Sequence, residues 1–226
     1  MTSSAARTII SLSGSLTGIS RGCFAEMQSD ASLALTAPYH AEEARALENT
    51  LRRFERQGVR FDQIVVIGCA QLRYADLALR HGIGYTAVDP NLDDHLDADK
   101  MSFIRDHSNV TLVRKSFSDL SREDLPKGKK LYFFLFNVFP YIKDGLETQK
   151  RLASPGDAAV ISTWNGESLA ARRLRDVYYC RLRDSFSKAA LPGRLDMDRL
   201  EGECDGFSAS QRRLRGKYTD ILVVKM

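Results

Sequence analysis

The chain has 226 residues, of which 43% are hydrophobic and 27% are charged, and its formal net charge is +4. This length suits one α/β domain with a full core and is short for two independent domains. The composition is close to the average of globular proteins, which excludes a disordered or fibrous class. No apolar run approaches the roughly 20 residues that a membrane-spanning helix requires, so no membrane partner is expected.

Four cysteines are scattered along the chain and form no CxxC pair: Cys23, Cys69, Cys180 and Cys204. This spacing argues against a zinc site and against a disulfide framework, so no metal and a cytoplasmic location are expected. The first 25 residues are rich in serine and contain no acid. That pattern is shared by transit peptides and by a small polar arm that folds over a binding site.

The basic excess lies near the C-terminus, where residues 171–226 contain 13 Lys and Arg against 8 Asp and Glu. Basic runs surround the segment VYY at helical spacing, as on the solvated face of a helix. Aromatic residues do not alternate with these charges as they do on RNA-binding surfaces. A nucleic-acid partner is therefore not favoured, and a homodimer stays open.

The helical periodicity is clearest in residues 40–58, where Leu47, Leu51 and Phe54 share a stripe that ends at Gly58. Further helices are expected over residues 72–82, in the polar stretch up to about residue 107, and over residues 167–186. Short runs rich in apolar and β-branched residues predict strands. These runs are residues 61–68, 83–90, 109–116, 129–137 and 157–163, followed by a hairpin around Gly216.

Strands that alternate with helices indicate βαβ units, and hence an α/β fold with a mostly parallel sheet. The predicted hairpin adds two antiparallel strands at the C-terminus. In open parallel sheets, ligands bind beyond the carboxyl ends of the strands. The residues at or just beyond those predicted ends are Gly68, Asp89, Ser118, Asp119, Asn137, Thr163 and Trp164.

Gly68 and Asp89 carry the most specific signal. A glycine at a strand end lets a ligand approach the backbone closely, and an acid at the end of the next strand accepts hydrogen bonds from both ribose hydroxyls. The two residues lie 21 positions apart, near the ~20 of dinucleotide-binding folds. A nucleoside site is therefore expected here.

From residue 61 to residue 163, and again in the terminal hairpin, the chain resembles the class I S-adenosylmethionine-dependent methyltransferases. The resemblance implies a Rossmann-like sheet with helices on both faces. It implies one cofactor-binding domain over residues 1–226, with residues 1–58 as a helical arm that covers the site. LASPGDAAVIST is similar to the family's segment before and through the fifth strand.

The resemblance also implies roles for single residues. The loop of Gly68, Cys69 and Ala70 would face the methionine part of the cofactor, and Asp89 would hold the ribose. Ser118 and Asp119 would meet the adenine. Asn137 would lie near the reacting centre, because FLFNVFPYIKD is similar to the family's fourth motif. The family loop reads GxGxG, whereas Leu72 stands here at the third glycine position.

Several side chains are candidates for catalysis and for the acceptor. The run NVFPY makes Asn137 and Tyr141 candidates, although the N-P-P-Y motif of amino-group methyltransferases is one residue shorter and has two prolines. His40 is the candidate general base. Aromatic faces stabilise a sulfonium cation, so Tyr39, Trp164 and Tyr178 are the candidate substrate-binding residues, with an ordinary place in the core as the alternative.

The sequence thus predicts an S-adenosylmethionine-dependent methyltransferase that acts on a small molecule. Transfer or cyclisation of the aminocarboxypropyl arm, with release of methylthioadenosine, is an alternative because the changed glycine loop faces that arm. A cofactor-binding protein without catalysis is a further alternative. A nicotinamide-dependent dehydrogenase is disfavoured because no GxGxxG follows the first strand.

Overall fold

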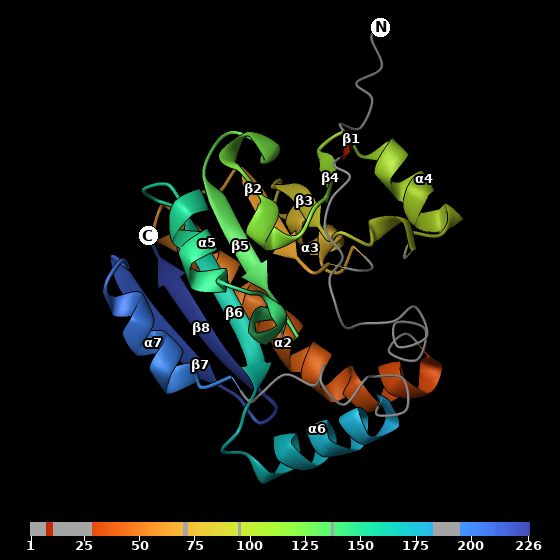
Figure 1. The fold of residues 1–226 in the computed structure, drawn as a ribbon, viewed down its shortest axis with the longest axis vertical. Helices are drawn as coiled ribbons and strands as arrows, with labels where there is room; N and C mark the ends of the chain where they lie inside the picture. Colours follow the sequence, from red (N-terminus) through yellow and green to blue (C-terminus); the bar gives the residue numbers. More distant parts are fainter. Residues whose placement is uncertain (1–7, 11–28, 70–71, 95, 137, 183–194) are drawn as a thin grey trace, which may run out of the picture.

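A computed structural model describes residues 8–10, 29–69, 72–94, 96–136, 138–182 and 195–226. These residues form an eight-stranded sheet in the order β1-β4-β3-β2-β5-β6-β8-β7 (Figure 1). Strands β1 to β6 run parallel, and β7 and β8 form the antiparallel hairpin beside β6. The predicted α/β class with a C-terminal hairpin is confirmed.

All the predicted strands occur. Most of their ends lie one to three residues inside the predicted ranges, because the predicted runs include residues of the flanking turns. An additional short strand, β1, pairs with β4 at the edge of the sheet. The strands are β1 (Thr8–Ile10), β2 (Gln63–Ile67), β3 (Gly84–Val88), β4 (Val110–Arg114), β5 (Lys130–Phe134), β6 (Ala158–Trp164), β7 (Ser210–Arg215) and β8 (Thr219–Lys225).

Helices cover both faces of the sheet, as expected. Figure 1 shows α2 behind the sheet, α5 and α7 in front of it, and α6 beyond the carboxyl ends of the parallel strands, alongside α2. The helices are α2 (Asp30–Arg56), α3 (Ala75–Arg80), α4 (Ala98–Asp106), α5 (Gly145–Leu152), α6 (Leu169–Leu182) and α7 (Met197–Asp205). None of the helices in the described ranges is long and apolar enough to cross a membrane.

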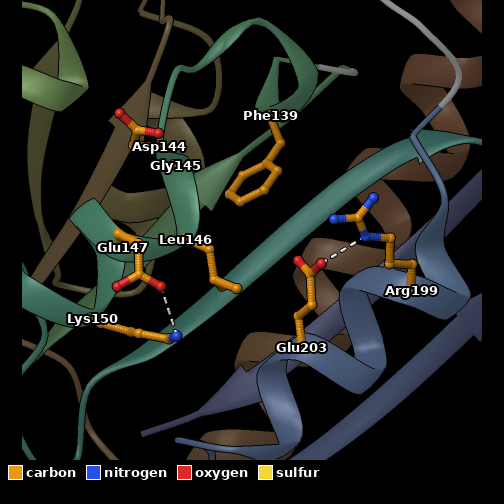
Figure 2. A pocket seen from close by; sticks show the side chains of 8 residues that line it. All are labelled: Phe139, Asp144, Gly145, Leu146, Glu147, Lys150, Arg199 and Glu203. Carbon is orange, nitrogen blue, oxygen red and sulfur yellow. Dashed lines mark hydrogen bonds and ion pairs between the residues drawn. The ribbon is translucent and has the colours of Figure 1, made fainter.

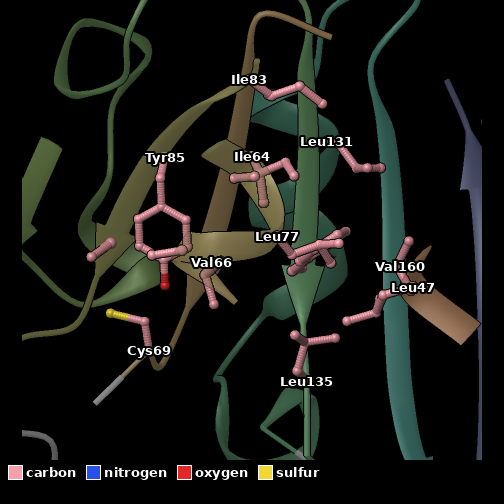
Figure 3. Packing of buried hydrophobic residues seen from close by; sticks show 14 of the residues in the cluster. Leu47, Ile64, Val66, Cys69, Leu77, Ile83, Tyr85, Leu131, Leu135 and Val160 are labelled. Carbon is pink, nitrogen blue, oxygen red and sulfur yellow. The ribbon is translucent and has the colours of Figure 1, made fainter. Parts of the chain in front are cut away.

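Alternate residues of β2 to β6 and of β8 enter two separate cores, because side chains of a strand point to opposite faces. Ile64 and Val66 of β2 pack with Leu47 of α2 and Leu77 of α3 on one face (Figure 3). Val65 of β2 packs on the other face with residues of α5 and α7. Burial on both faces explains why the central strands read as nearly continuous apolar runs.

Helix α2 begins ten residues earlier than predicted. The Ser29 hydroxyl caps it by accepting a hydrogen bond from the N–H of Ser32 at 3.2 Å, and Pro38 lies within the helix. Its first half buries polar side chains, among them Thr36 and Glu43. The hydrophobic stripe therefore stops where the helix continues, which is why periodicity placed its start at residue 40.

Helix α3 is shorter than predicted, whereas α5 and α7 were not predicted. Leu72 and Tyr74 have φ values of 54° and 66°, and this left-handed backbone is incompatible with a helix. Helix α3 therefore starts only at Ala75. Helices α5 and α7 are short, at eight and nine residues, and give too few turns for a clear periodicity.

Glu42 attaches the first half of α2 to the hairpin. Its Oε1 accepts hydrogen bonds from the N–H of Tyr218 at 3.0 Å and from the N–H and hydroxyl of Thr219 at 2.8 and 2.7 Å. Its Oε2 accepts from the N–H of Lys217 at 3.1 Å. Burial alone would raise the pKa of Glu42, but these hydrogen bonds outweigh burial and lower it.

The Glu42→Gln variant should lower the free energy of unfolding by about 1 kcal/mol, because it weakens charge-assisted hydrogen bonds. Urea titration followed by circular dichroism measures the loss. The matched control is Glu147→Gln, which removes only an exposed pair with Lys150. Equal midpoints for the two variants would contradict this role of Glu42.

Candidate functional site

Five neighbouring strands of the sheet run parallel, so their carboxyl ends lie side by side at one end of the strands, which is called the sheet edge below. These strands are β2, β3, β4, β5 and β6. Gly68 follows β2 and Asp89 follows β3. A 3₁₀ turn with Ser118 and Asp119 follows β4, and Phe136 follows β5. The residues predicted to follow these strands are thus brought to the same end of the sheet, in the spatial order β4, β3, β2, β5.

The backbone conformation and the close packing at position 68 both require a glycine. Gly68 has a φ of +66°, and its N–H donates to the carbonyl of Val88 at 2.8 Å. A Cβ at this position would lie 2.9 Å from Cγ1 of Val138, in the segment after β5. The glycine therefore makes room for a neighbouring loop, and not only for a ligand as the sequence suggested.

The loop after Gly68 keeps a glycine-like conformation at its end. Leu72, which stands at the third glycine position of the family loop, has a φ of 54°. Its side chain is buried in the core under α3. The core contacts of the leucine hold a backbone that glycine would adopt without strain.

Asp89 is a buried acid at the end of β3. It is 4% exposed, and its N–H donates to the carbonyl of Val113 at 3.2 Å, which continues the β3–β4 pairing. Its Oδ1 accepts from the N–H of Asn91 at 2.8 Å, which fixes the carboxylate in a local turn. The carboxylate is held at the sheet edge next to the β2 loop.

The predicted adenine residues form a compact turn. Asp119 is exposed and accepts a hydrogen bond from the hydroxyl of Ser116 at 2.6 Å. Ser118 donates from its hydroxyl to the carbonyl of Lys143 at 2.7 Å. The Ser118 hydroxyl thus connects this turn to the segment before α5.

Other predicted site residues differ in their surroundings. The side chain of Cys69 is buried in the core beside Tyr85 (Figure 3), and burial followed by the nearby charge of Asp89 raises the pKa of its thiol. Only the backbone of Cys69 is thus left to face a ligand. Tyr141 ends the 3₁₀ turn Phe139–Tyr141. Ala70 and Asn137 lie outside the described residues.

The three predicted substrate-binding aromatics lie together between α2, β6 and α6. The ring centroids of Tyr39 and Trp164 are 4.5 Å apart, and those of Trp164 and Tyr178 are 6.3 Å apart. Their exposed fractions are 0%, 5% and 2% in chain order. The ring of Phe136 contacts all three rings and is partly exposed at the sheet edge. These four residues are called the aromatic cluster below.

His40 lies at the border of the aromatic cluster. Its ring centroid is 4.5 Å from that of Phe136, and its Nδ1 is 3.3 Å from Nη1 of Arg73. Arginine has no acceptor, so Nδ1 accepts this hydrogen bond and the proton of the neutral ring is on Nε2. Burial lowers the pKa of His40 and the charge of Arg73 lowers it further, and together they outweigh Glu43, which raises it. In this arrangement the ring presents a donor, and a base role requires Arg73 to release Nδ1.

Glu43 is the buried charge that the sequence reasoning missed. Its side chain lies within hydrogen-bond distance of Tyr74, Phe136 and Ser162, which come from three other segments. A signal was present, because Glu43 lies four residues before Leu47 on the buried stripe of α2. An acid on an apolar helical stripe indicates a buried, paired carboxylate.

A separate hollow lies between α5 and α7. It has a volume of about 500 Å³, and Phe139 and Leu146 contribute its apolar lining (Figure 2). Four of its charged side chains form pairs, with 2.8 Å between Glu147 and Lys150 and 2.7 Å between Arg199 and Glu203. It contains none of the described residues at the ends of β2, β3 and β4 and is not the candidate site. In the described part of the chain, no group of His, Cys, Asp and Glu is arranged to hold a metal.

No family model and no curated protein matches this chain. Solved structures do match. A 1,6-didemethyltoxoflavin-N1-methyltransferase of Burkholderia thailandensis is 14% identical, with a TM-score of 0.57 over 90% of this chain and 85% of that one. An O-methyltransferase family protein of the same organism is 15% identical, with a TM-score of 0.59 over 93% and 64%.

The plantazolicin methyltransferase BpumL, in complex with S-adenosylhomocysteine, is 9% identical, with a TM-score of 0.55 over 90% of this chain and 93% of that one. All three similarities extend over at least nine tenths of the chain, so they include the sheet and the helices on both its faces. At these identities the similarities establish the fold alone. The function is inferred from the residues at the sheet edge.

Proposed function

We propose that this chain, which has the fold of class I S-adenosylmethionine-dependent methyltransferases, transfers a methyl group from that cofactor to a small molecule. The observation that carries the proposal is Asp89, a buried carboxylate fixed at the end of β3 beside the left-handed Gly68 at the end of β2. A carboxylate in this place accepts hydrogen bonds from a ribose diol.

The residues present fit the cofactor. With the ribose at Asp89, we infer that the adenine lies toward the turn with Ser118 and Asp119, because β4 is the neighbour of β3 on the side away from β2. The methionine arm then extends the other way, toward the loops that follow β2 and β5. When bound, the cofactor supplies a methyl group already activated by a sulfonium, so the protein contributes chiefly orientation and exclusion of water.

The methyl acceptor is proposed to bind at the partly exposed part of the aromatic cluster, next to His40. Phe136 and His40 are partly exposed there, and the guanidinium of Arg73 lies over the Phe136 ring, 5.4 Å from its centroid. Such a surface suits a flat small molecule. The similar structures include enzymes named for toxoflavin and plantazolicin methylation, which supports an acceptor of this size class.

Residues 1–58 are proposed to cover the site as a helical arm of a single domain. Within the described residues, the first half of α2 lies against α6 beyond the strand ends, which supports this view (Figure 1). Asn137 and Tyr141 stay candidates for contact with the reacting centre. A cytoplasmic location and a homodimer stay predictions.

The test has two steps. Isothermal titration with S-adenosylhomocysteine should show binding at one site per chain. Incubation with S-adenosylmethionine and a panel of aromatic and heteroaromatic acceptors, followed by mass spectrometry, should then show adenosylhomocysteine and an acceptor heavier by one methylene. Release of methylthioadenosine would show arm chemistry instead. Absence of binding would overturn the assignment.

A further inference from the structure

Glu43 is completely buried, with 0% of its surface exposed, at the point where α2 meets the carboxyl ends of the sheet. Its Oε1 accepts from the N–H of Phe136 at 2.9 Å and from the hydroxyl of Ser162 in a short hydrogen bond. Its Oε2 accepts from the hydroxyl of Tyr74 at 2.8 Å and lies 3.8 Å from Nδ1 of His40.

The partners of Glu43 favour its charged form. Burial would raise the pKa of Glu43, but the contact with His40, the hydrogen bond from Ser162 and the nearby charge of Arg73 outweigh burial and lower it. Because the hydroxyl of Ser162 donates to Glu43, it accepts from Tyr39, whose oxygen is 3.1 Å away. A buried ion with this many donors is a fixed element of the site.

Two of the donors belong to residues with unusual backbones. Tyr74 and Phe136 have φ values of 66° and 50°, a left-handed region that costs a non-glycine residue about 1 kcal/mol or more. Tyr74 lies in the loop after β2, and Phe136 is the second residue after the end of β5. The carboxylate of Glu43 thus accepts a hydrogen bond from each of these two residues. A strained backbone conformation persists only where neighbouring groups stabilise it.

We propose that Glu43 is a positioning residue, which holds Tyr74 and Phe136 in place next to the methionine arm of the cofactor. The inference rests on the function proposed above, in which that arm extends from Asp89 toward β2 and β5. The hydrogen bonds that Glu43 accepts come from Tyr74 in the loop after β2, from Phe136 at the start of the segment after β5 and from Ser162 in β6. The nucleoside end, at β3 and β4, does not depend on them.

Two ligands separate this role from a merely structural one. S-adenosylhomocysteine and methylthioadenosine share the nucleoside and the sulfur, and only the former has the aminocarboxypropyl arm. The Glu43→Gln variant keeps the side-chain size and removes the charge. We expect it to weaken S-adenosylhomocysteine binding by about tenfold and to change methylthioadenosine binding by less than about twofold, measured by isothermal titration.

Glu42→Gln is the matched control, because Glu42 is the adjacent residue of the same helix and holds the hairpin instead of the loops. It should leave both affinities unchanged while lowering stability. The Tyr74→Phe variant removes one hydrogen bond to Glu43 and keeps the buried charge. It should weaken S-adenosylhomocysteine alone, by about threefold, and it decides the question if Glu43→Gln does not fold.

The outcomes are distinct. If the unmodified protein binds neither ligand, the proposed function itself is overturned. If it binds both, and the Glu43 and Tyr74 variants bind both as tightly as before or lose both in parallel, Glu43 only attaches α2 to the sheet and the inference is wrong. A loss confined to S-adenosylhomocysteine supports it.

Discussion

Replacement of Asp89 by alanine is expected to weaken the binding of S-adenosylhomocysteine by about 100-fold, because a charge-assisted hydrogen bond contributes about 1.5–3 kcal/mol and a ribose diol makes two. Asp89 is nearly buried, so water would replace the carboxylate poorly. The variant also loses the local hydrogen bond from the N–H of Asn91. Isothermal titration at constant salt measures the change in affinity.

Two controls accompany this prediction. Asp89→Asn keeps an oxygen for Asn91 and removes the charge, so it should lose nearly as much affinity as alanine. Asp93→Ala removes an exposed acid of the same loop, which pairs with Arg114 at 2.8 Å, and should leave affinity unchanged. If Asp89→Ala binds as tightly as the unmodified chain, the ribose is not held at β3.

Replacement of Gly68 by alanine is expected to lower the free energy of unfolding by about 2–3 kcal/mol. One part of the loss is the left-handed φ of +66°. The other part is the new methyl group, which would lie 2.9 Å from Cγ1 of Val138, a stiff β-branched side chain. The displaced loop should also weaken S-adenosylhomocysteine binding.

Gly82→Ala separates the two parts of this loss. Gly82 has nearly the same φ, +67°, and a Cβ there would meet nothing within 4 Å. Its substitution should cost about 1 kcal/mol, from the backbone alone. Chemical denaturation of both variants gives the difference. Equal losses would show that Val138 adapts and that contact between the two loops is not tight.

Much of the fold could be predicted from local patterns. The runs that became β2 and β5 are continuously apolar because the sheet is covered on both faces. Gly68 and Asp89 stood out because strand ends and their spacing are visible along the chain. The start of α2 was wrong because its first half buries Ser32, Thr36 and Glu43, which give no hydrophobic stripe.

The detailed surroundings of the site could not be predicted. Val138 fills the space beside Gly68, and the thiol of Cys69 turns into the core. Leu72 has a left-handed backbone, because its core contacts compensate for the strain. Each of these outcomes depends on a neighbour from another segment, which sequence spacing does not reveal.

By itself, the sequence determined where the strands follow one another along the chain and which residues end them. Apolar runs, their alternation with helical segments, and turn residues are visible over a few positions. Only the tertiary structure decided what those ends contact. Glu43 reaches Phe136 across 93 positions and Ser162 across 119. A buried charge is stable only where distant donors converge on it, and that convergence exists only after the sheet and α2 have packed together.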